Sequence, residues 1–349
     1  MRLLFASPFP YWPDNTSGRE TSAHALTLRL QARGIDVAVF AGTLKTAPAE
    51  GTRPFIIRDE TLGYPVFRAR EPLLAYNDLL AEFRPDIAIL PFHEPVMPLV
   101  ALGLGAGIKA ALLVTSVDPR SVGLNLIQRP EIMLLACSPF TARRIEALHG
   151  IRPPVTLPLV EPDDYRVPGN GDAVLMVNPT LMKGVEIFFR LAEARPQLPF
   201  IAVESWDITD EWRLILANRA RALGNVELWS PVADMRPAYA RARLVLMPSF
   251  HEETYGRVVA EAQLSGIPAL CSDRGALLET GGQGARTIDA DAPIDDWLSA
   301  LDAMLGPLHR SCSIAARREA ERPERRPEAI VDDLLKVLET FSAAPNTIC

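Results

Sequence analysis

Cysteine, lysine and long apolar runs are scarce in this sequence. Its four cysteines stand far apart and form no C-x-x-C pair, which excludes a zinc ribbon and a secreted disulfide framework and fits a reducing, cytoplasmic compartment. No stretch reaches the roughly 20 unbroken apolar residues of a membrane-spanning helix. The N-terminal apolar run breaks at Ser7 and Pro8, too early for a signal peptide. The basic run 317–326 leaves a peripheral membrane contact open as an alternative, but its interleaved glutamates favour a solvated, ion-paired face.

Positive charge is scarce as well. Acidic residues outnumber lysine and arginine by 43 to 36, and the net charge is −7, so the average surface repels nucleic acid and no nucleic-acid partner is expected. Only four of the basic residues are lysines: Lys45, Lys109, Lys183 and Lys336. Codon bias explains this scarcity without any function. Because lysines are so few, however, each one is considered for a specific role.

The residues that are present describe a folded α/β protein. Hydrophobic residues at 48% and charged residues at 23% are the ordinary globular balance, and at about 150 residues per domain the length of 349 predicts two domains. Apolar runs at 35–42, 85–92 and 109–116 alternate with helical patterns. Such alternation is typical of βαβ units and of parallel sheets covered on both faces.

The proline-rich segment 152–173 is the predicted linker, because the strand and helix alternation restarts after it at 173–178. We therefore predict a Rossmann-like domain over residues 1–160, a second over 161–325, and a C-terminal helix in 326–349 that packs back on the first domain. Ligands bind beyond the carboxyl ends of parallel strands. The residues that follow strands, facing a cleft between the domains, are therefore the candidates for a site.

The stretch PSFHEETYGRVVAEAQLSGIPALCSD, residues 248–273, carries the most information. A strand ends at Ser249, and a helix is predicted from about Gly256. Glu253 and Glu261 lie eight residues apart, about 12 Å along an ideal helix and nearly on one face. Ionised carboxylates only accept hydrogen bonds, so they suit sugar and ribose hydroxyls.

The start of this predicted helix also suits a phosphate. The N–H groups of Tyr255, Gly256 and Arg257 lack partners within the helix, and the helix dipole favours an anion there. The alternative is an exposed helix start whose acidic residues only complement the dipole. Spacing alone does not decide between the two interpretations.

The segment from Glu253 to Glu261, preceded by MPS and followed by Gly266-Ile267-Pro268, resembles the E-x7-E signature of retaining glycosyltransferases of family 4. That family has the GT-B fold, in which two Rossmann-like domains face a central cleft. The resemblance implies that Glu253 contacts the donor sugar and that Glu261 holds the ribose. It also implies that the backbone after Glu253 contacts sugar and diphosphate, through Thr254, Tyr255, Gly256 and Arg257.

The segment VLMVNPTLMKGVEIF, residues 174–188, resembles the family's strand and loop with the lysine that neutralises the donor diphosphate. Lys183 falls at that position. Many members have an arginine five or six residues earlier, where this chain has Asn178 and Pro179, a form that some members share. The resemblance implies that Asn178 binds the donor, that Arg257 assists Lys183, and that the backbone near Val232 meets the base.

The first domain resembles the family less closely. SGRE at 17–20 resembles the G-G-x-E loop after the first strand, which implies that Gly18 faces the donor phosphate and the acceptor. His93 follows the predicted strand 85–92 and is a candidate acceptor or reaction-centre residue; a loop histidine without function is the alternative. Where members often have a histidine, in a T-x-H arrangement, this chain has Val117.

A metal is not expected. Asp289-Ala290-Asp291 has the form of a metal-binding D-x-D, but it lies late in a turn-like segment, and GT-B enzymes do not rely on a metal. The resemblance implies a hexosyltransferase that moves a sugar with retention from a UDP- or GDP-linked donor to an unidentified acceptor hydroxyl, with no cofactor. Residues 1–160 then form the acceptor side and 161–325 the donor domain.

Two alternatives remain open. One is a non-catalytic GT-B subunit that binds a partner, suggested by Val117 and by Asn178 at the positions of the missing histidine and arginine. The other is a GT-B nucleotide-sugar epimerase, against which the Glu253 to Glu261 spacing and the Lys183 loop argue.

Overall fold

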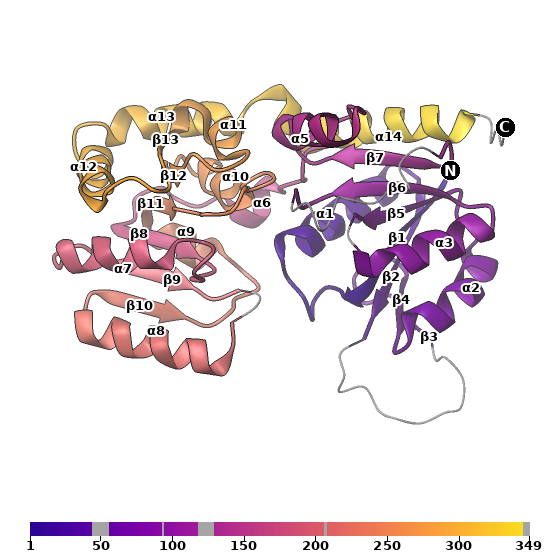
Figure 1. The fold of residues 1–349 in the computed structure, drawn as a ribbon, viewed down its shortest axis with the longest axis horizontal. Coiled ribbons are helices and arrows are strands. Elements are labelled where there is room, and N and C mark those ends of the chain that lie inside the picture. The colour runs from indigo at the N-terminus through magenta and orange to yellow at the C-terminus, as the bar shows by residue number, and fades with distance from the viewer. Residues whose placement is uncertain (44–55, 93, 118–128, 206–207, 345–349) are drawn as a thin grey trace. The chain divides into compact units, whose positions relative to one another are not determined.

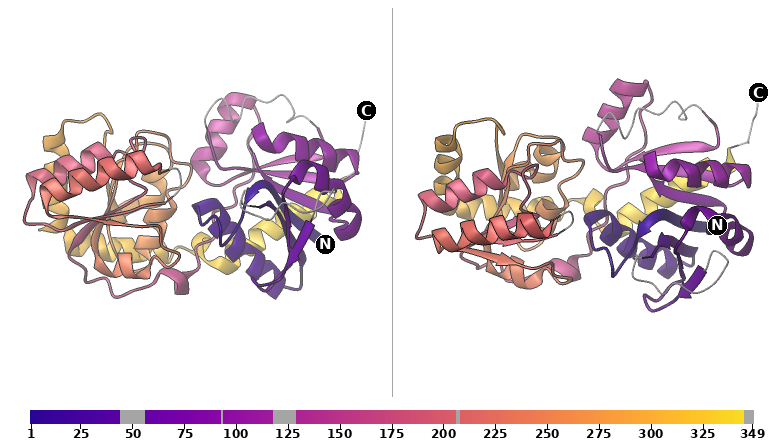
Figure 2. Two further views of the ribbon diagram at one scale, coloured as in Figure 1. Left: turned by 90° about the horizontal axis from the view of Figure 1, so that it is seen from below. Right: turned by 60° about the horizontal axis from the view of Figure 1, so that its bottom comes forward.

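The computed structural model describes residues 1–43, 56–92, 94–117, 129–205 and 208–344. The chain divides into two compact units, Met1–Leu159 together with Pro327–Cys349, and Val160–Arg326. The boundary after Leu159 falls within the proline-rich segment. Each unit is built on one sheet of mainly parallel strands with helices on both faces (Figure 1; Figure 2), which confirms the predicted α/β class.

Over the described residues, the sheet of the first unit has seven strands in the order β3-β4-β2-β1-β5-β6-β7. All neighbours are parallel except β3 and β4. The strands are β1 (Arg2–Pro10), β2 (Asp36–Gly42), β3 (Ile56–Asp59), β4 (Val66–Ala69), β5 (Ile87–Pro91), β6 (Lys109–Val114) and β7 (Ile132–Ala136). The helices are α1 (Gly18–Ala32), α2 (Pro72–Phe83), α3 (Met97–Gly105), α5 (Pro139–His149) and α14 (Pro327–Ala343), with the short 3-10 helix η1 (Glu94–Val96).

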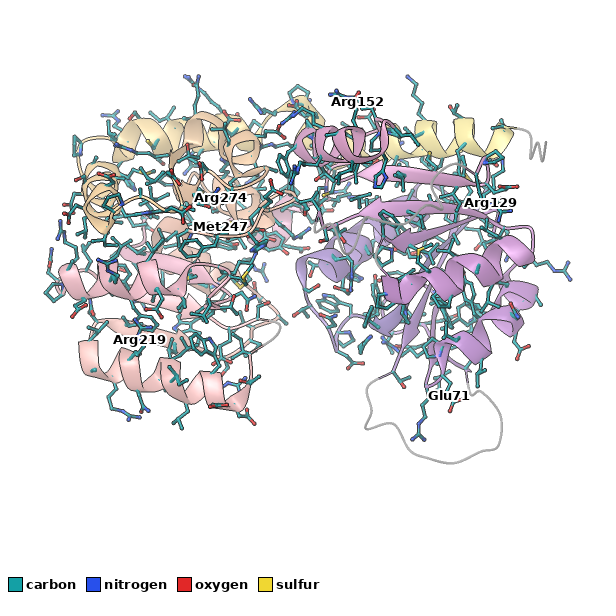
Figure 3. All side chains as sticks on the ribbon, in the orientation of Figure 1. Glu71, Arg129, Arg152, Arg219, Met247 and Arg274 are labelled. Atoms are coloured by element: carbon teal, nitrogen blue, oxygen red, sulfur yellow. The ribbon has the colours of Figure 1, made fainter. Side chains whose placement is uncertain are left out.

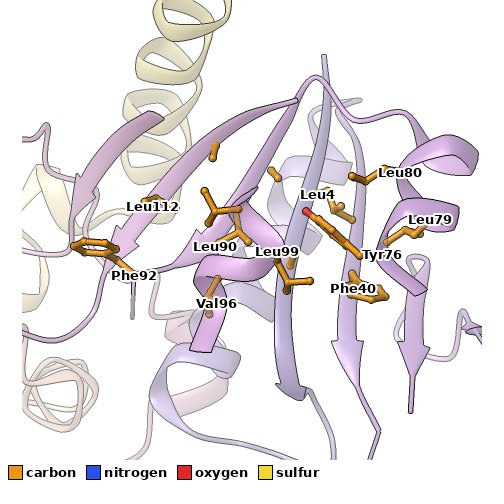
Figure 4. Packing of buried hydrophobic residues seen from close by; sticks show 14 of the residues in the cluster. Leu4, Phe40, Tyr76, Leu79, Leu80, Leu90, Phe92, Val96, Leu99 and Leu112 are labelled. Carbon is orange, nitrogen blue, oxygen red and sulfur yellow. The ribbon is translucent and has the colours of Figure 1, made fainter. Parts of the chain in front are cut away.

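This sheet is buried on both faces because side chains alternate along each strand. On β1, Leu4 and Ala6 join one apolar cluster, with residues of α2 and α3, part of which Figure 4 shows. Leu3 and Phe5 join the other cluster, with residues of α1 and α14. The nearly continuous apolar runs in the sequence are the consequence of this two-sided burial.

Helix α14 completes the first unit although it comes from the end of the chain. Ile330, Leu334 and Leu338 are buried in the same cluster as Leu30 of α1. Two exposed ion pairs join these helices, from Arg29 to Glu328 and from Arg33 to Asp332. One face of the sheet is therefore covered in part by residues that come after the whole second unit in the sequence.

Lys109 at the start of β6 fixes the end of α14. Its Nζ is buried and donates to the carbonyl oxygens of Phe341 (2.8 Å), Ser342 (3.0 Å) and Ala344 (2.6 Å). The last carbonyls of a helix have no partner within it, and the helix dipole makes that end attractive to a cation. One of the four lysines thus has a structural role.

The second unit has six parallel strands in the order β10-β9-β8-β11-β12-β13. The strands are β8 (Ala173–Val177), β9 (Phe200–Val203), β10 (Val226–Trp229), β11 (Ala242–Met247), β12 (Ala269–Ser272) and β13 (Ala285–Ile288). The helices are α6 (Pro162–Tyr165), α7 (Val185–Ala194), α8 (Asp210–Leu223), α9 (Arg236–Arg241), α10 (Arg257–Gln263), α11 (Leu277–Gly281), α12 (Ile294–Leu305) and α13 (His309–Ala320), with the 3-10 helices η3 (Gly282–Gly284) and η4 (Pro323–Arg325).

The core of the second unit places β8 and β11 side by side at the centre of the sheet. Phe188 and Phe200 pack edge to face, and Trp297 of α12 is fully buried with them. The strand order runs outward in opposite directions from the β8 and β11 pair. This is the topological switch point at which open α/β sheets bind ligands. Among the helices of the described residues, none is long and apolar enough to cross a membrane.

We expect Lys109→Met to lower the free energy of unfolding by about 1–3 kcal/mol, because three carbonyl oxygens at the end of α14, that of Phe341 buried, lose a charged donor. Lys336 is exposed on α14, so Lys336→Met is the matched control and should change stability by less than about 0.5 kcal/mol. Urea unfolding of both variants makes the comparison. Equal stability of the two variants would contradict the capping role of Lys109.

Candidate functional site

The candidate site of the second unit lies at its topological switch point. The loop after β8 carries Asn178 and Lys183, and the loop after β11 carries Glu253. Because β8 and β11 are neighbours in the sheet, these two loops leave the same edge side by side. Residues that are 70 positions apart in the sequence are brought into contact in this way.

Glu253 is a buried carboxylate with one oxygen fully engaged. Lys183 Nζ lies 2.5 Å from Oε1, the Ser249 hydroxyl donates to Oε1 at 2.6 Å, and His251 Nε2 lies 3.3 Å from it. The other oxygen, Oε2, has no hydrogen-bond partner in the part of the chain that the structure describes. Glu253 can therefore accept a hydrogen bond from a ligand without giving up Lys183.

The charges around Glu253 lower its pKa by more than its burial raises it. Burial alone raises the pKa of a carboxyl group, but Lys183 and His251, with hydrogen bonds from Lys183 and Ser249, hold the pKa of Glu253 below its ordinary value. Glu253 is therefore ionised at neutral pH. Lys183 is itself largely buried, with 13% of its side chain exposed, so the pair is shielded from water and from salt screening.

The backbone of the loop after β12 pairs with the backbone of Glu253. Gly275 forms a parallel β-bridge with Glu253, and Ala276 N–H donates to the Glu253 carbonyl oxygen at 2.7 Å. Gly275 has φ of +72°, and a Cβ added there would lie 2.2 Å from that oxygen. Only glycine fits, since any side chain would displace the backbone that carries Glu253.

A second close approach brings Lys183 to the same place. Gly184 has φ of +80°, and an added Cβ would lie 2.0 Å from the carbonyl oxygen of Pro248. The amide of Phe250 also donates to the Met182 carbonyl oxygen at 2.9 Å. The two loops therefore touch through their backbones on both sides of Lys183.

Asn178 is the most unusual polar residue of the site. It follows β8 directly in the left-handed conformation, with φ of +61°, which asparagine tolerates better than most residues. Its side chain is buried, yet neither amide atom has a hydrogen-bond partner among the described residues. Buried polar groups without partners are rare in folded proteins and call for an explanation such as a missing ligand.

Glu261 and Arg257 form a separate buried pair on α10. Arg257 Nε donates to Glu261 Oε1 at 2.6 Å, and the Tyr239 hydroxyl donates to Oε2 at 2.6 Å. Burial dominates here, and it raises the pKa of Glu261 above its ordinary value in spite of Arg257, Tyr239 and Tyr165. Arg257 donates to Glu261 and Tyr165, and its expected assistance to Lys183 stays a prediction.

The other predicted donor residues of the second unit differ in burial and position. Thr254 is half-buried, and Tyr255 is buried with its carbonyl oxygen accepting from the Thr280 hydroxyl. Gly256 precedes the first residue of α10 as its N-cap. Val232 is half-buried in the loop between β10 and α9. The structure thus joins Lys183 to Glu253 and Arg257 to Glu261, and it leaves Val232 outside both pairs.

The candidate residues of the first unit lie at the carboxyl ends of its strands. Gly18 is exposed and is the first residue of α1, directly after the loop that follows β1. Glu20 is buried and accepts hydrogen bonds from Ser17 and Arg19. Val117 is buried after β6. His93 lies outside the described residues, so the structure does not place it.

Sequence reasoning missed the residues that support the two glutamates. Ser249 and His251 stand inside the recognised stretch, so their position before Glu253 was a usable signal. Tyr165 and Gly275 come from other segments, and their contacts with the site follow only from the fold.

Asp289 and Asp291 face a guanidinium group. Arg274, labelled in Figure 3, donates to Asp291 Oδ2 and lies 3.8 Å from Asp289 Oδ1. Within the described ranges, no group of three or more His, Cys, Asp or Glu side chains is arranged to hold a metal ion.

Comparison with known proteins gives a family match within the second unit. Residues 183–306 match the family described as "Glycosyl transferases group 1". No curated relative is similar enough in sequence to match. Among solved structures, sucrose-phosphate synthase from Thermosynechococcus elongatus has a TM-score of 0.81 at 15% identity, covering 99% of this chain and 100% of that one.

Two further structures show the same likeness. A glycosyltransferase from Rickettsia africae has a TM-score of 0.77 at 14% identity, with 99% of both chains covered. HepE from Anabaena, in complex with UDP and glucose, has a TM-score of 0.76 at 16% identity, covering 99% of this chain and 100% of that one. The GT-B fold is thereby confirmed. With the matching domain, the predicted enzyme class, glycosyltransferase, is confirmed too, whereas the assignment to family 4 stays a prediction.

We expect Gly275→Ala to slow glycosyl transfer about a hundredfold, because the new Cβ displaces the Glu253 backbone and small displacements at a reacting centre have effects of that size. Gly224 at the end of α8 also has positive φ, but an added Cβ meets nothing within 4 Å. Gly224→Ala carries the same backbone strain and should keep activity within about twofold. Steady-state kinetics of both variants tests this prediction. An equal loss of activity in the two variants would show that backbone strain at positive φ is responsible, and not displacement of Glu253.

We expect Lys183→Met to lower the free energy of unfolding by about 3 kcal/mol at neutral pH, since Glu253 keeps a buried charge without its partner. The lowered pKa of wild-type Glu253 contributes stability above the unfolded pKa that is lost as pH falls through the folded pKa. Without Lys183 the pKa of the buried Glu253 rises, so the variant takes up a proton at a higher pH than wild type and its deficit should shrink as pH falls from 7 to 3. Urea unfolding between pH 3 and pH 7 tests this, and a deficit independent of pH would contradict it.

Proposed function

We propose that the enzyme transfers a sugar from a UDP- or GDP-linked donor to an acceptor hydroxyl, with retention of configuration and without a metal. The pair of Lys183 and Glu253 carries this proposal. It sets a cation suited to diphosphate beside a carboxylate suited to sugar hydroxyls, 2.5 Å apart, at the switch point of the sheet. The complexes of Anabaena HepE with UDP and with UDP-glucose support a nucleotide sugar as donor.

Lys183 acts on the leaving group. Its ammonium has three N–H donors, and Glu253 takes one of them. The remaining donors can reach oxygens of the donor diphosphate, whose negative charge grows as the bond to the sugar breaks. A preorganised cation in a water-poor site stabilises that charge. The N-terminus of α7, which begins at Val185, adds the positive end of a helix dipole to the same loop.

Retention follows if the acceptor attacks from the face that the diphosphate leaves. The bond from the anomeric carbon to the diphosphate oxygen breaks, a bond to the acceptor oxygen forms on the same face, and the acceptor proton passes to the diphosphate. Glu253 orients the sugar through Oε2. It stays ionised throughout because Lys183, His251 and Ser249 offset its burial.

The other donor contacts extend from this centre. Asn178 offers an amide that can donate to phosphate oxygens, and a ligand there would satisfy its buried polar atoms. Glu261 takes the ribose hydroxyls, the backbone at Val232 takes the base, and residues 254–256 line the donor between the two carboxylates. Gly18 is the proposed contact of the first unit with the donor phosphate and the acceptor.

The second candidate is a non-catalytic member of the same glycosyltransferase class, in which donor turnover has been lost. Val117 occupies the place of an expected histidine, and neutral Asn178 occupies the place of an expected arginine. Such a protein would bind a nucleotide sugar or a partner without turning the donor over. It would therefore share the binding properties of the enzyme and differ from it in kinetics alone.

A thermal-shift screen with UDP- and GDP-sugars first identifies the donor by its stabilisation of the protein. With that donor, we expect Lys183→Ala to lower the rate of transfer or donor hydrolysis by about 10²–10³-fold, and Glu253→Ala to have a comparable effect. Lys336→Ala, on the exposed face of α14, is the control and should keep full activity.

Three outcomes separate the candidates. Turnover that both site variants retain would refute the proposed mechanism. Donor binding without any wild-type turnover would favour the non-catalytic protein. The anomeric configuration of the product, read by NMR, tests retention, and activity that survives a chelator tests independence from a metal.

A further inference from the structure

Glu261 is held on both of its carboxylate oxygens by two different helices. Only 6% of the residue is exposed. Arg257, one turn earlier on α10, donates to Oε1, and Tyr239 of α9 donates to Oε2, each at 2.6 Å. The carboxylate cannot rotate without breaking one of these bonds, so its plane is fixed relative to both helices.

Arg257 is itself oriented by a third element. Its terminal nitrogen donates to the Tyr165 hydroxyl at 3.0 Å, and its guanidinium lies 5.5 Å from the centre of the Tyr165 ring. The rings of Tyr165 and Tyr239 pack edge to face at 6.2 Å. Tyr165, Tyr239, Arg257 and Glu261, which we call the Glu261 cluster, therefore join α6, α9 and α10.

Stability alone gives little reason for such a cluster. Apolar residues of similar volume are often as stabilising as a buried ion pair, because charges lose their hydration when they are buried. The position of Tyr239 suggests another role. Helix α9 begins at Arg236, directly after the loop that contains Val232, so Tyr239 connects that loop to the carboxylate of Glu261.

We propose that Arg257 and Tyr239 are positioning residues for recognition of a nucleoside diphosphate with free ribose hydroxyls. They hold the Glu261 carboxylate at a fixed place relative to the Val232 loop, so that ribose and base are read as one unit. Arg257 acts through Glu261 and not on the diphosphate. This inference rests on the proposed function, in which Glu261 takes the ribose.

The charge of Glu261 depends on the same contacts. The groups that face it are Arg257 on its own helix, Tyr239 from α9 and Tyr165 from α6. Burial already raises the pKa of Glu261, and Arg257 opposes that effect. Without Arg257 the pKa rises further, and a protonated carboxyl is a poorer acceptor for ribose hydroxyls. A variant without Arg257 should recover ribose recognition as pH rises.

The experiment compares UDP with 2′,3′-dideoxy-UDP, and GDP with its dideoxy analogue, by calorimetric titration of the full chain. Hydrogen bonds from the ribose to an ionised carboxylate predict that wild-type protein prefers the natural nucleotide by about tenfold or more. In Tyr239→Phe and Arg257→Met this preference should fall below about threefold, while affinity for the dideoxy nucleotide changes little. Arg257→Lys should retain part of the preference.

Tyr76→Phe is the matched control. Tyr76 lies in the first unit, and its buried hydroxyl has no hydrogen-bond partner among the described residues. Its loss should leave the preference at the wild-type value. In Arg257→Met the preference should increase between pH 6 and pH 9 more steeply than in wild-type protein.

The outcomes are distinguishable. An unchanged preference in Tyr239→Phe and Arg257→Met overturns this inference and leaves the proposed function standing, and so does an equal loss of affinity for both nucleotides, which a purely structural role would produce. Wild-type protein that binds neither UDP nor GDP overturns the proposed function as well. If Arg257→Met does not fold, Tyr239→Phe decides alone, because it removes a single oxygen atom.

Discussion

The contact between Lys183 and Glu253 is the interaction on which the site depends. Two opposite charges, both largely withdrawn from water, have each other as the main compensation for lost hydration. The fold supplies everything else that this contact needs. Adjacent strands β8 and β11 bring the loops together, Gly184 and Gly275 allow close backbone approach, and Ser249 adds a hydroxyl. Little freedom remains for either side chain, and that preorganisation is what electrostatic stabilisation of a leaving group requires.

The two glutamates of the same short stretch are in opposite electrostatic situations. Glu253 keeps one oxygen open, and its neighbours lower its pKa. Glu261 is engaged on both oxygens, and burial raises its pKa. The arrangement of Glu253 suits reversible binding of a ligand beside a cation. The arrangement of Glu261 suits a carboxylate that keeps one fixed orientation in the binding site. Two glutamates eight positions apart can therefore contact one ligand and still differ in how much the surroundings of each carboxylate change when the ligand leaves.

Much of the fold was predictable because buried parallel strands leave continuous apolar runs, and the glutamate and lysine positions were predictable because they lie in compact motifs. The strands β3, β4 and β13 were not predicted, since each has only four residues with an arginine among them and shows no such run. The role of Arg257 beside a diphosphate stays a prediction, whereas its contacts with Glu261 and Tyr165 were not predicted. Contacts of this kind, like those of Gly275, join distant segments, and no local pattern records them.

The way α14 closes the first unit also affects how the protein is made. Five of its residues belong to the buried cluster that covers one face of the first sheet, and the ribosome delivers them only after the entire second unit. At about 5–20 residues per second, the nascent first unit waits on the order of ten seconds with that face covered by α1 but not by α14. The second unit, contiguous in sequence, can complete its core earlier. The N-terminal half of the chain is therefore the last to finish folding, and its partly covered sheet face during synthesis is a natural binding surface for a chaperone.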